Sequence, residues 1–173
     1  AIDLAIGQAD AGADAILIPE IPYSYESVHA RIRERELHHK RFAVVVVADG
    51  AREKGGGMVS IGEKVDGEVR LGGVSLVVAN ELVRLTGKEA RNVVLGHLQR
   101  GGIPTAFDRL LCTMFGASAV DLIEAGDFGK MVAFQGTRVT AVPISHAIER
   151  LKTVPLNDTL MRTARAMGIS LGD

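Results

Sequence analysis

The sequence has a single cysteine, Cys112, among its 173 residues. One cysteine excludes an internal disulfide and any metal site built from several cysteines. Because paired cysteines mark oxidising compartments, their lack favours a reducing, cytoplasmic location. The first residues also lack the basic and apolar regions of a secretory signal, so we expect no export.

Long apolar runs are missing as well. No stretch of about 18 consecutive apolar residues occurs, so no membrane-spanning helix is expected. Neither sign of charge dominates, because 20 Lys and Arg face 21 Asp and Glu, for a formal net charge of -1. We therefore expect no nucleic-acid partner and no membrane partner held by bulk charge, and any anion site must be local.

Four common catalytic motifs are absent from the sequence: the Walker loop, the Rossmann glycine fingerprint, the H-E-x-x-H zinc motif and the Ser-centred nucleophile elbow. No residue forms a credible general base beside a phosphoryl donor. From its residues alone the chain is predicted to bind a ligand rather than to complete a reaction. We assign it no catalytic residue, no metal ligand and no cofactor-binding residue.

Short apolar strands alternate with amphipathic helices along the chain. The alternation predicts an α/β fold with a mostly parallel sheet flanked by helices. The run at 42–48 is apolar and β-branched, which favours a central strand buried on both faces. Further strands are expected at 15–18, 92–95, 130–134 and 138–142, a loop with a short β-excursion at 49–73, and helices at 1–10, 25–38, 74–86, 106–125, 144–152 and 158–167.

Candidate binding residues follow the ends of two of these strands, where α/β folds place their ligands. Asp49 ends the strand at 42–48, and its carboxylate could accept a hydrogen bond from a sugar hydroxyl. His97 and Arg100 follow the strand at 92–95, before a Gly-Gly pair that lets backbone amides approach an anion. An arginine fork donates two parallel hydrogen bonds to a phosphate.

Each of these residues also has an ordinary explanation. Asp49 before glycine is typical of a turn, and Arg100 could pair with Asp108 on the next helix. A lone histidine after a strand, such as His97, is more often structural than functional. Arg91 begins the strand at 92–95 and would lie about 20 Å from His97 if that strand is extended. Arg91 is therefore either a surface residue or part of a site built with another chain.

The spacing around these residues resembles the phosphofructokinase signature at every defined position. The shared positions are Arg91, Gly96, His97, Gln99, Arg100, Gly101, Gly102, Asp108 and Arg109. Residues 12–20 are similar to the family's strand that ends in Pro-Glu, and residues 42–50 to its central strand and ligand turn. The tail at 151–173 resembles the group that uses ATP or pyrophosphate. The resemblance implies a phosphofructokinase-like, Rossmann-like three-layer fold.

The resemblance also implies a role for each candidate. His97 and Arg100 would contact the 6-phosphate of fructose 6-phosphate, and Arg91 would reach that phosphate in a neighbouring subunit of a dimer or tetramer. Asp49 stands where the family usually has a glutamate that binds sugar hydroxyls, so its carboxylate is one carbon shorter. Asp14 and Lys40 fall near positions of a nucleotide effector site in some bacterial members.

The activity implied is phosphoryl transfer from ATP or pyrophosphate to the 1-hydroxyl of fructose 6-phosphate in glycolysis, with Mg²⁺. The family's donor loop, catalytic base and metal ligands have no counterpart in this sequence. We therefore expect the carboxy-terminal half of a longer enzyme, inactive alone, cut within its first helix. Residues 1–125 would form a partial fructose 6-phosphate-binding domain, and 126–173 would pack back on it. The alternative is a non-catalytic phosphosugar-binding or interaction module.

Overall fold

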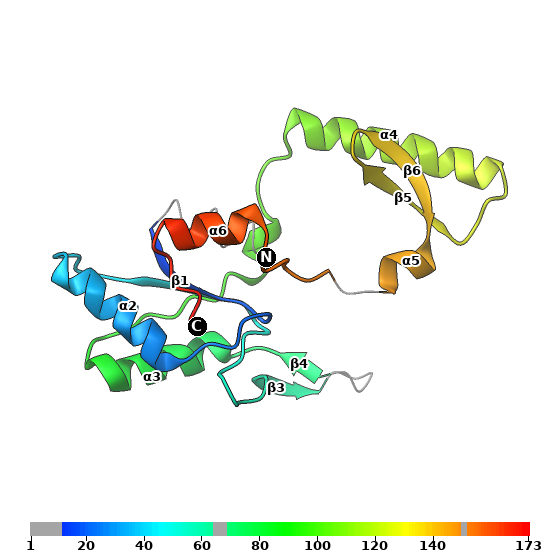
Figure 1. Ribbon diagram of the computed structural model, residues 1–173. Coiled ribbons are helices and arrows are strands. Elements are labelled where there is room, and N and C mark those ends of the chain that lie inside the picture. Colours follow the sequence, from blue (N-terminus) through cyan, green and yellow to red (C-terminus); the bar gives the residue numbers. More distant parts are fainter. Residues whose placement is uncertain (1–11, 64–68, 150–151) are drawn as a thin grey trace. The chain divides into compact units, whose positions relative to one another are not determined.

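The computed structural model describes residues 12–63, 69–149 and 152–173, and the helix expected at 1–10 lies outside them (Figure 1). The chain divides into two compact units. Unit 1 consists of Ala1–Val94 and Thr153–Asp173, and unit 2 of Leu95–Lys152. This division does not coincide with the functional boundary expected at residue 125, which stays a prediction.

Unit 1 is built on a parallel strand pair, β1 (Ala13–Leu17) and β2 (Val44–Val47). The tail residue Ser170 forms a parallel bridge to Ala15 on the other edge of β1. The Ile16 amide donates to the Ser170 carbonyl at 2.9 Å, and the Ser170 amide donates to the Asp14 carbonyl at 2.9 Å. The predicted parallel sheet is confirmed, and β1 lies at its centre.

We expected residues 42–48 to form the central strand, buried on both faces. This is wrong, because β1 and not β2 lies at the centre of the sheet. The side chains of β2 are half-buried, whereas those of β1 are buried throughout. The reason is that β1 has a neighbour on each edge. In the described part of the chain β2 pairs only with β1.

The side chains of β1 point alternately to two buried clusters, as the twofold periodicity of a strand requires. On one face they meet α6 (Thr159–Ala166), and on the other α2 (Tyr25–Leu37) and α3 (Val74–Thr86). The α6 cluster contains Ile16, Ile18, Ile21, Met161, Ala164 and Leu171. The α2–α3 cluster contains Ala15, Leu17, Tyr23, Val28, Val74, Val78 and Leu82. Helices thus cover both faces of the sheet, which confirms the three-layer α/β fold.

The expected β-excursion between residues 49 and 73 is a small antiparallel pair, β3 (Ser60–Glu63) and β4 (Val69–Leu71). The helix α3 follows it directly and has the bounds that its apolar periodicity predicts. It ends at Gly87, whose φ of +68° is a left-handed conformation that glycine adopts without strain.

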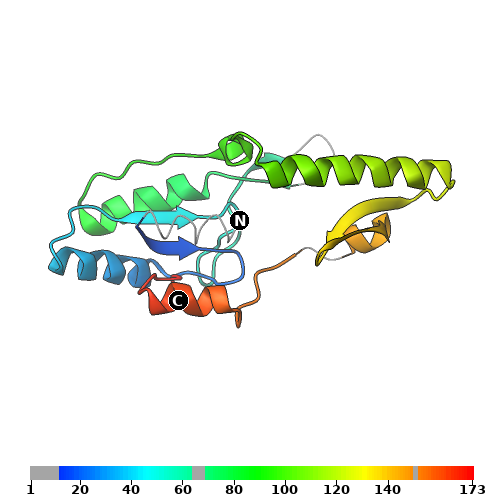
Figure 2. The same cartoon turned by 90° about the horizontal axis from the view of Figure 1, so that it is seen from above.

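Unit 2 contains a 3₁₀ turn, η1 (Gly96–Arg100), a long helix, α4 (Ala106–Glu124), and a hairpin of β5 (Lys130–Gln135) and β6 (Arg138–Pro143). The hairpin is followed by the short helix α5 (Ile144–Ile148). Figure 2 shows α4 running alongside the hairpin. Among the described residues of unit 2 none is buried, so this unit has no enclosed core of its own.

The strand expected at residues 92–95 is wrong. These residues have no strand conformation, and Val93 and Val94 are 73% and 68% exposed. A strand is held by hydrogen bonds to a neighbouring strand, and this segment has no such neighbour within the described residues. The apolar, β-branched sequence alone does not supply one.

Asp14 is the one buried charged side chain of the described residues, with 1% exposure. Its Oδ1 accepts from Nη1 of Arg35 on α2 at 2.5 Å, and its Oδ2 accepts from the Val44 amide at 2.9 Å. Nε of Arg35 also donates to the Phe42 carbonyl at 2.6 Å. Both Asp14 oxygens thus have protein donors, and the residue ties β1 to the end of α2 and the start of β2.

We expect Asp14→Ala to lower the free energy of unfolding by roughly 3 kcal/mol, because it leaves the half-buried Arg35 guanidinium without its counter-ion. Urea unfolding followed by circular dichroism measures the change. Glu81→Ala is the control, since it removes an exposed ion pair with Arg84 and should leave the midpoint unchanged. Equal midpoints for both variants would contradict this role of Asp14.

Candidate functional site

Asp49 lies at the corner of a tight turn that follows β2. The Ala51 amide donates to the Ala48 carbonyl at 2.8 Å, which closes the turn over Asp49 and Gly50. Ala51 is fully buried, whereas the Asp49 side chain is exposed. The turn predicted for Asp-Gly is therefore present, and it projects the carboxylate from the carboxyl end of a parallel strand.

His97 and Arg100 both lie on the turn η1, three residues apart. In a regular 3₁₀ helix, residues three apart are almost eclipsed. Both are exposed. The structure thus places two of the four candidate residues on one short turn, as two exposed basic groups.

The glycines after η1 are required by the backbone. Gly101 donates its amide to the Leu98 carbonyl at 3.0 Å, and a Cβ on Gly101 would lie 3.2 Å from that same oxygen. Gly102 has a φ of +117°, which side chains rarely allow. The Gly-Gly pair therefore lets the chain leave η1 tightly and without side chains beside His97 and Arg100.

Asp108 caps the helix that follows. Its Oδ2 accepts from the Thr105 amide at 2.8 Å and from the Thr105 hydroxyl at 2.7 Å, while the Asp108 amide donates to Thr105 Oγ1 at 3.2 Å. This capping box holds the pKa of the Asp108 carboxyl below its usual range, first through the Thr105 hydroxyl and then through the Thr105 amide. Among the described ion pairs none joins Arg100 to Asp108, so that alternative for Arg100 is wrong.

Arg91 is too exposed for the surrounding protein to fix the position of its side chain. Its side chain is 87% exposed, and its Nε contacts Oε1 of Glu89, itself 78% exposed, at 3.2 Å. It belongs to unit 1 together with Asp49, whereas His97 and Arg100 belong to unit 2. The expected separation of about 20 Å between Arg91 and His97 assumed an extended strand at 92–95. Because that strand is not formed, this expectation no longer holds.

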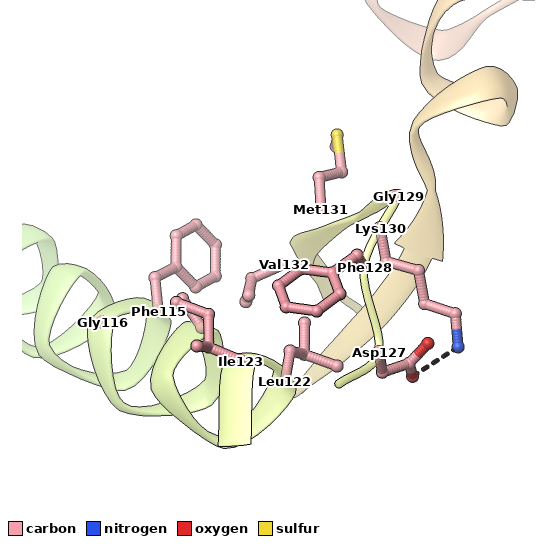
Figure 3. A pocket seen from close by; sticks show the side chains of 11 residues that line it. Phe115, Gly116, Leu122, Ile123, Asp127, Phe128, Gly129, Lys130, Met131 and Val132 are labelled. Atoms are coloured by element: carbon pink, nitrogen blue, oxygen red, sulfur yellow. Dashed lines mark hydrogen bonds and ion pairs between the residues drawn. The ribbon is translucent and has the colours of Figure 1, made fainter. Parts of the chain in front are cut away.

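Unit 2 also has an open apolar groove of about 510 Å³ between α4 and β5 (Figure 3). Figure 3 shows Phe115, Leu122, Phe128 and Val132 gathered along it. At its rim, Nζ of Lys130 contacts Oδ2 of Asp127 at 2.6 Å. Because these two charges neutralise each other, the groove suits an apolar group rather than a phosphate.

Sequence reasoning missed Tyr23, which is 2% exposed beside the Asp49 turn. Its ring packs edge-on against Tyr25, with centroids 5.4 Å apart, and the two hydroxyls are 3.4 Å apart. Burial, followed by the hydrogen bond to Tyr23, raises the pKa of Tyr25, so its phenol stays protonated. The available signal was weak: these are the only two tyrosines of the chain.

The described residues contain no group of three or more His, Cys, Asp or Glu side chains that could hold a metal ion. None of the described helices combines the length and apolar character that crossing a bilayer demands.

The family model described as "Phosphofructokinase" matches residues 2–123. Curated relatives extend the match further. ATP-dependent 6-phosphofructokinase 1 of Synechocystis sp. is 48% identical over 162 residues, which are 94% of this chain and 45% of the relative. Pyrophosphate–fructose 6-phosphate 1-phosphotransferase of Amycolatopsis methanolica is 50% identical over 146 residues, 83% of this chain and 42% of the relative. The chain thus spans less than half the length of these relatives.

Solved structures agree on the fold. A pyrophosphate-dependent phosphofructokinase from Nitrosospira multiformis matches with a TM-score of 0.64 and 22% identity, over 92% of this chain and 41% of the other. The T-state phosphofructokinase of Pichia pastoris matches with a TM-score of 0.56 and 29% identity, over 90% of this chain and 16% of the other.

We expect Thr105→Ala to cost about 1 kcal/mol of stability at neutral pH, because it breaks the cap of α4. The ionised Asp108 contributes above the ordinary carboxyl pKa of about 4, and its contribution is lost as the pH falls through the lowered pKa of the folded state. The variant should therefore respond less to acid than the parent. Unfolding followed by circular dichroism at several pH values measures this.

Thr113→Ala is the matched control, because the Thr113 hydroxyl donates to the Arg109 carbonyl within the same helix and caps nothing. Its pH response should equal that of the parent. A pH response of Thr105→Ala that equals both would show that the capping box has no part in the acid sensitivity.

Proposed function

Because this chain belongs to the phosphofructokinase family, we propose that it supplies the sugar-phosphate-binding half of a 6-phosphofructokinase. The parent enzyme would transfer a phosphoryl group from ATP or pyrophosphate to the 1-hydroxyl of fructose 6-phosphate, in glycolysis and in the cytoplasm. One relative is named as ATP-dependent and another as using pyrophosphate, which supports both compounds as candidate donors.

The observation that carries the proposal is the place of His97 and Arg100, two exposed basic residues three apart on the turn η1. A phosphate oxygen carries concentrated negative charge, and the guanidinium of Arg100 can donate two parallel hydrogen bonds to it. His97, one 3₁₀ turn earlier, adds a ring N–H donor. The two groups would hold the 6-phosphate and leave the far end of the sugar free for reaction.

Asp49 and Arg91 would complete the acceptor site. The Asp49 carboxylate, exposed at its turn, would accept hydrogen bonds from sugar hydroxyls. Arg91, with its side chain 87% exposed, would reach the 6-phosphate bound by a neighbouring subunit. That role requires a homo-oligomer, either a dimer or a tetramer.

We place the phosphoryl donor, Mg²⁺ and the catalytic base on the part of the relatives' length that this chain does not span. In-line phosphoryl transfer needs all three positioned together, so the chain alone should not catalyse it. The same missing part would cover the apolar groove of unit 2 in the whole enzyme. Within this chain, residues 1–125 would bind the sugar phosphate, and 126–173 would support them.

We expect Arg100→Ala in the full-length protein to raise the KM for fructose 6-phosphate by about tenfold or more, because it removes charge-assisted hydrogen bonds to the phosphate. The KM for the phosphoryl donor should not change. Steady-state assays with ATP and with pyrophosphate measure both constants.

Arg138→Ala is the control, since it removes another exposed arginine, on the hairpin of the same unit. An unchanged KM for fructose 6-phosphate in Arg100→Ala would sink the assignment. The chain alone, assayed in parallel, should form no fructose 1,6-bisphosphate. Turnover by the chain alone would refute the placement of the donor site.

A further inference from the structure

The turn that carries Asp49 is held from the side of β1. The Ala48 amide donates to the Leu17 carbonyl at 2.9 Å, which fixes where the turn begins. Ala51, at its far end, is fully buried in the same cluster as Leu17. These two anchors hold the backbone of the Asp49 turn in place at the edge of the sheet.

Tyr23 fixes the chain just beyond this turn. Its amide donates to the Arg52 carbonyl at 3.0 Å, and its carbonyl accepts from the Lys54 amide at 2.7 Å. The two bonds bracket Glu53 in a parallel bridge. Because Tyr23 is almost fully buried, its backbone position sets the position of residues 52–54, and through Ala51 that of the Asp49 turn.

Gly172 presses against Tyr23 from the tail. A Cβ on Gly172 would lie 2.5 Å from the Tyr23 Cβ, 2.8 Å from Leu17 Cδ2 and 3.2 Å from the Tyr23 Cα. The Gly172 carbonyl accepts from the Ser24 amide at 2.7 Å, so the tail cannot move away freely. With a φ of +82° as well, this position admits only glycine without displacing Tyr23.

We propose that Gly172 is a positioning residue for the sugar site, acting through Tyr23 on the Asp49 turn. The inference rests on the proposed role of Asp49 in binding the sugar hydroxyls. It adds that the tail of the chain, far from Asp49 in sequence, determines the affinity for the sugar. A displacement of about 1 Å at a binding group can cost up to about a hundredfold in rate or affinity.

Two substitutions test the chain of contacts from its two ends. Gly172→Ala forces a methyl group against Tyr23. Lys54→Pro removes the backbone N–H that donates to the Tyr23 carbonyl, together with the side-chain charge. The backbone should tolerate proline there, because Lys54 is the second residue of a turn closed by the Gly56 amide and the Glu53 carbonyl at 2.9 Å. Gly55, the third residue of this turn, has a φ of +80°, as a type II turn requires. Proline is common at the second position of a type II turn, which Lys54 occupies.

Each substitution has a matched control. Gly168→Ala meets the same backbone penalty, since Gly168 has a φ of +76°, but its methyl would lie 3.3 Å from the flexible end of Arg31. Lys54→Ala removes the same side-chain charge as Lys54→Pro and keeps the N–H. These controls separate displacement of Tyr23 from general loss of stability.

In the full-length protein we expect the KM for fructose 6-phosphate to rise about tenfold in Gly172→Ala and several-fold in Lys54→Pro. The kcat and the KM for the donor should stay within about twofold of the parent, as should all constants of both controls. Hydrogen exchange at the Tyr23 and Lys54 amides should quicken in Gly172→Ala and not in Gly168→Ala. If Gly172→Ala does not fold, Lys54→Pro against Lys54→Ala decides alone.

An unchanged KM for fructose 6-phosphate in Gly172→Ala and Lys54→Pro, with an active parent, would overturn the inference and leave the proposed function standing. Equal losses of kcat in Gly172→Ala and Gly168→Ala would overturn it as well, because a purely structural glycine gives that result. A parent without activity on fructose 6-phosphate would end both proposals.

Discussion

The burial of β1 on both faces and both edges is the constraint on which unit 1 depends. Its side chains belong to two buried clusters, so a single strand of five residues packs against α6 on one face and against α2 and α3 on the other. At its start, Asp14 holds Arg35 and the Val44 amide. At its end, the Leu17 carbonyl holds Ala48 and so fixes where the Asp49 turn begins. A displacement of β1 would therefore reach the candidate sugar contact directly.

Unit 2 is held together differently from unit 1. None of its described residues is buried, so its shape comes from local hydrogen bonds: the 3₁₀ turn, the Thr105–Asp108 capping box and the hairpin. One of these local devices, the turn η1, carries both His97 and Arg100. The local devices leave the apolar faces of α4 and β5 open, which accords with a chain that spans less than half the length of its relatives.

Sequence patterns predicted the elements whose cause is local. The apolar periodicity of 74–86 gave both ends of α3, and the Gly-containing turn gave the β5–β6 hairpin. They failed where a distant partner decides: residues 92–95 have strand-like composition but no neighbour among the described residues, and β1 rather than β2 is central because Ser170 pairs with it. The contact of Gly172 with Tyr23 has no local signature in the sequence either.

The central claim is a sugar-phosphate site to which one subunit gives His97 and Arg100 and its neighbour gives Arg91. Co-expression of full-length Arg91→Ala and Arg100→Ala subunits tests it most directly, because a mixed interface then contains one intact site. Activity at limiting fructose 6-phosphate should recover to about a quarter of the parent's in the mixture. Mixing Arg100→Ala with His97→Ala should recover none, since both groups would come from the same subunit. A mixture of Arg91→Ala and Arg100→Ala no more active than its components would contradict the shared site.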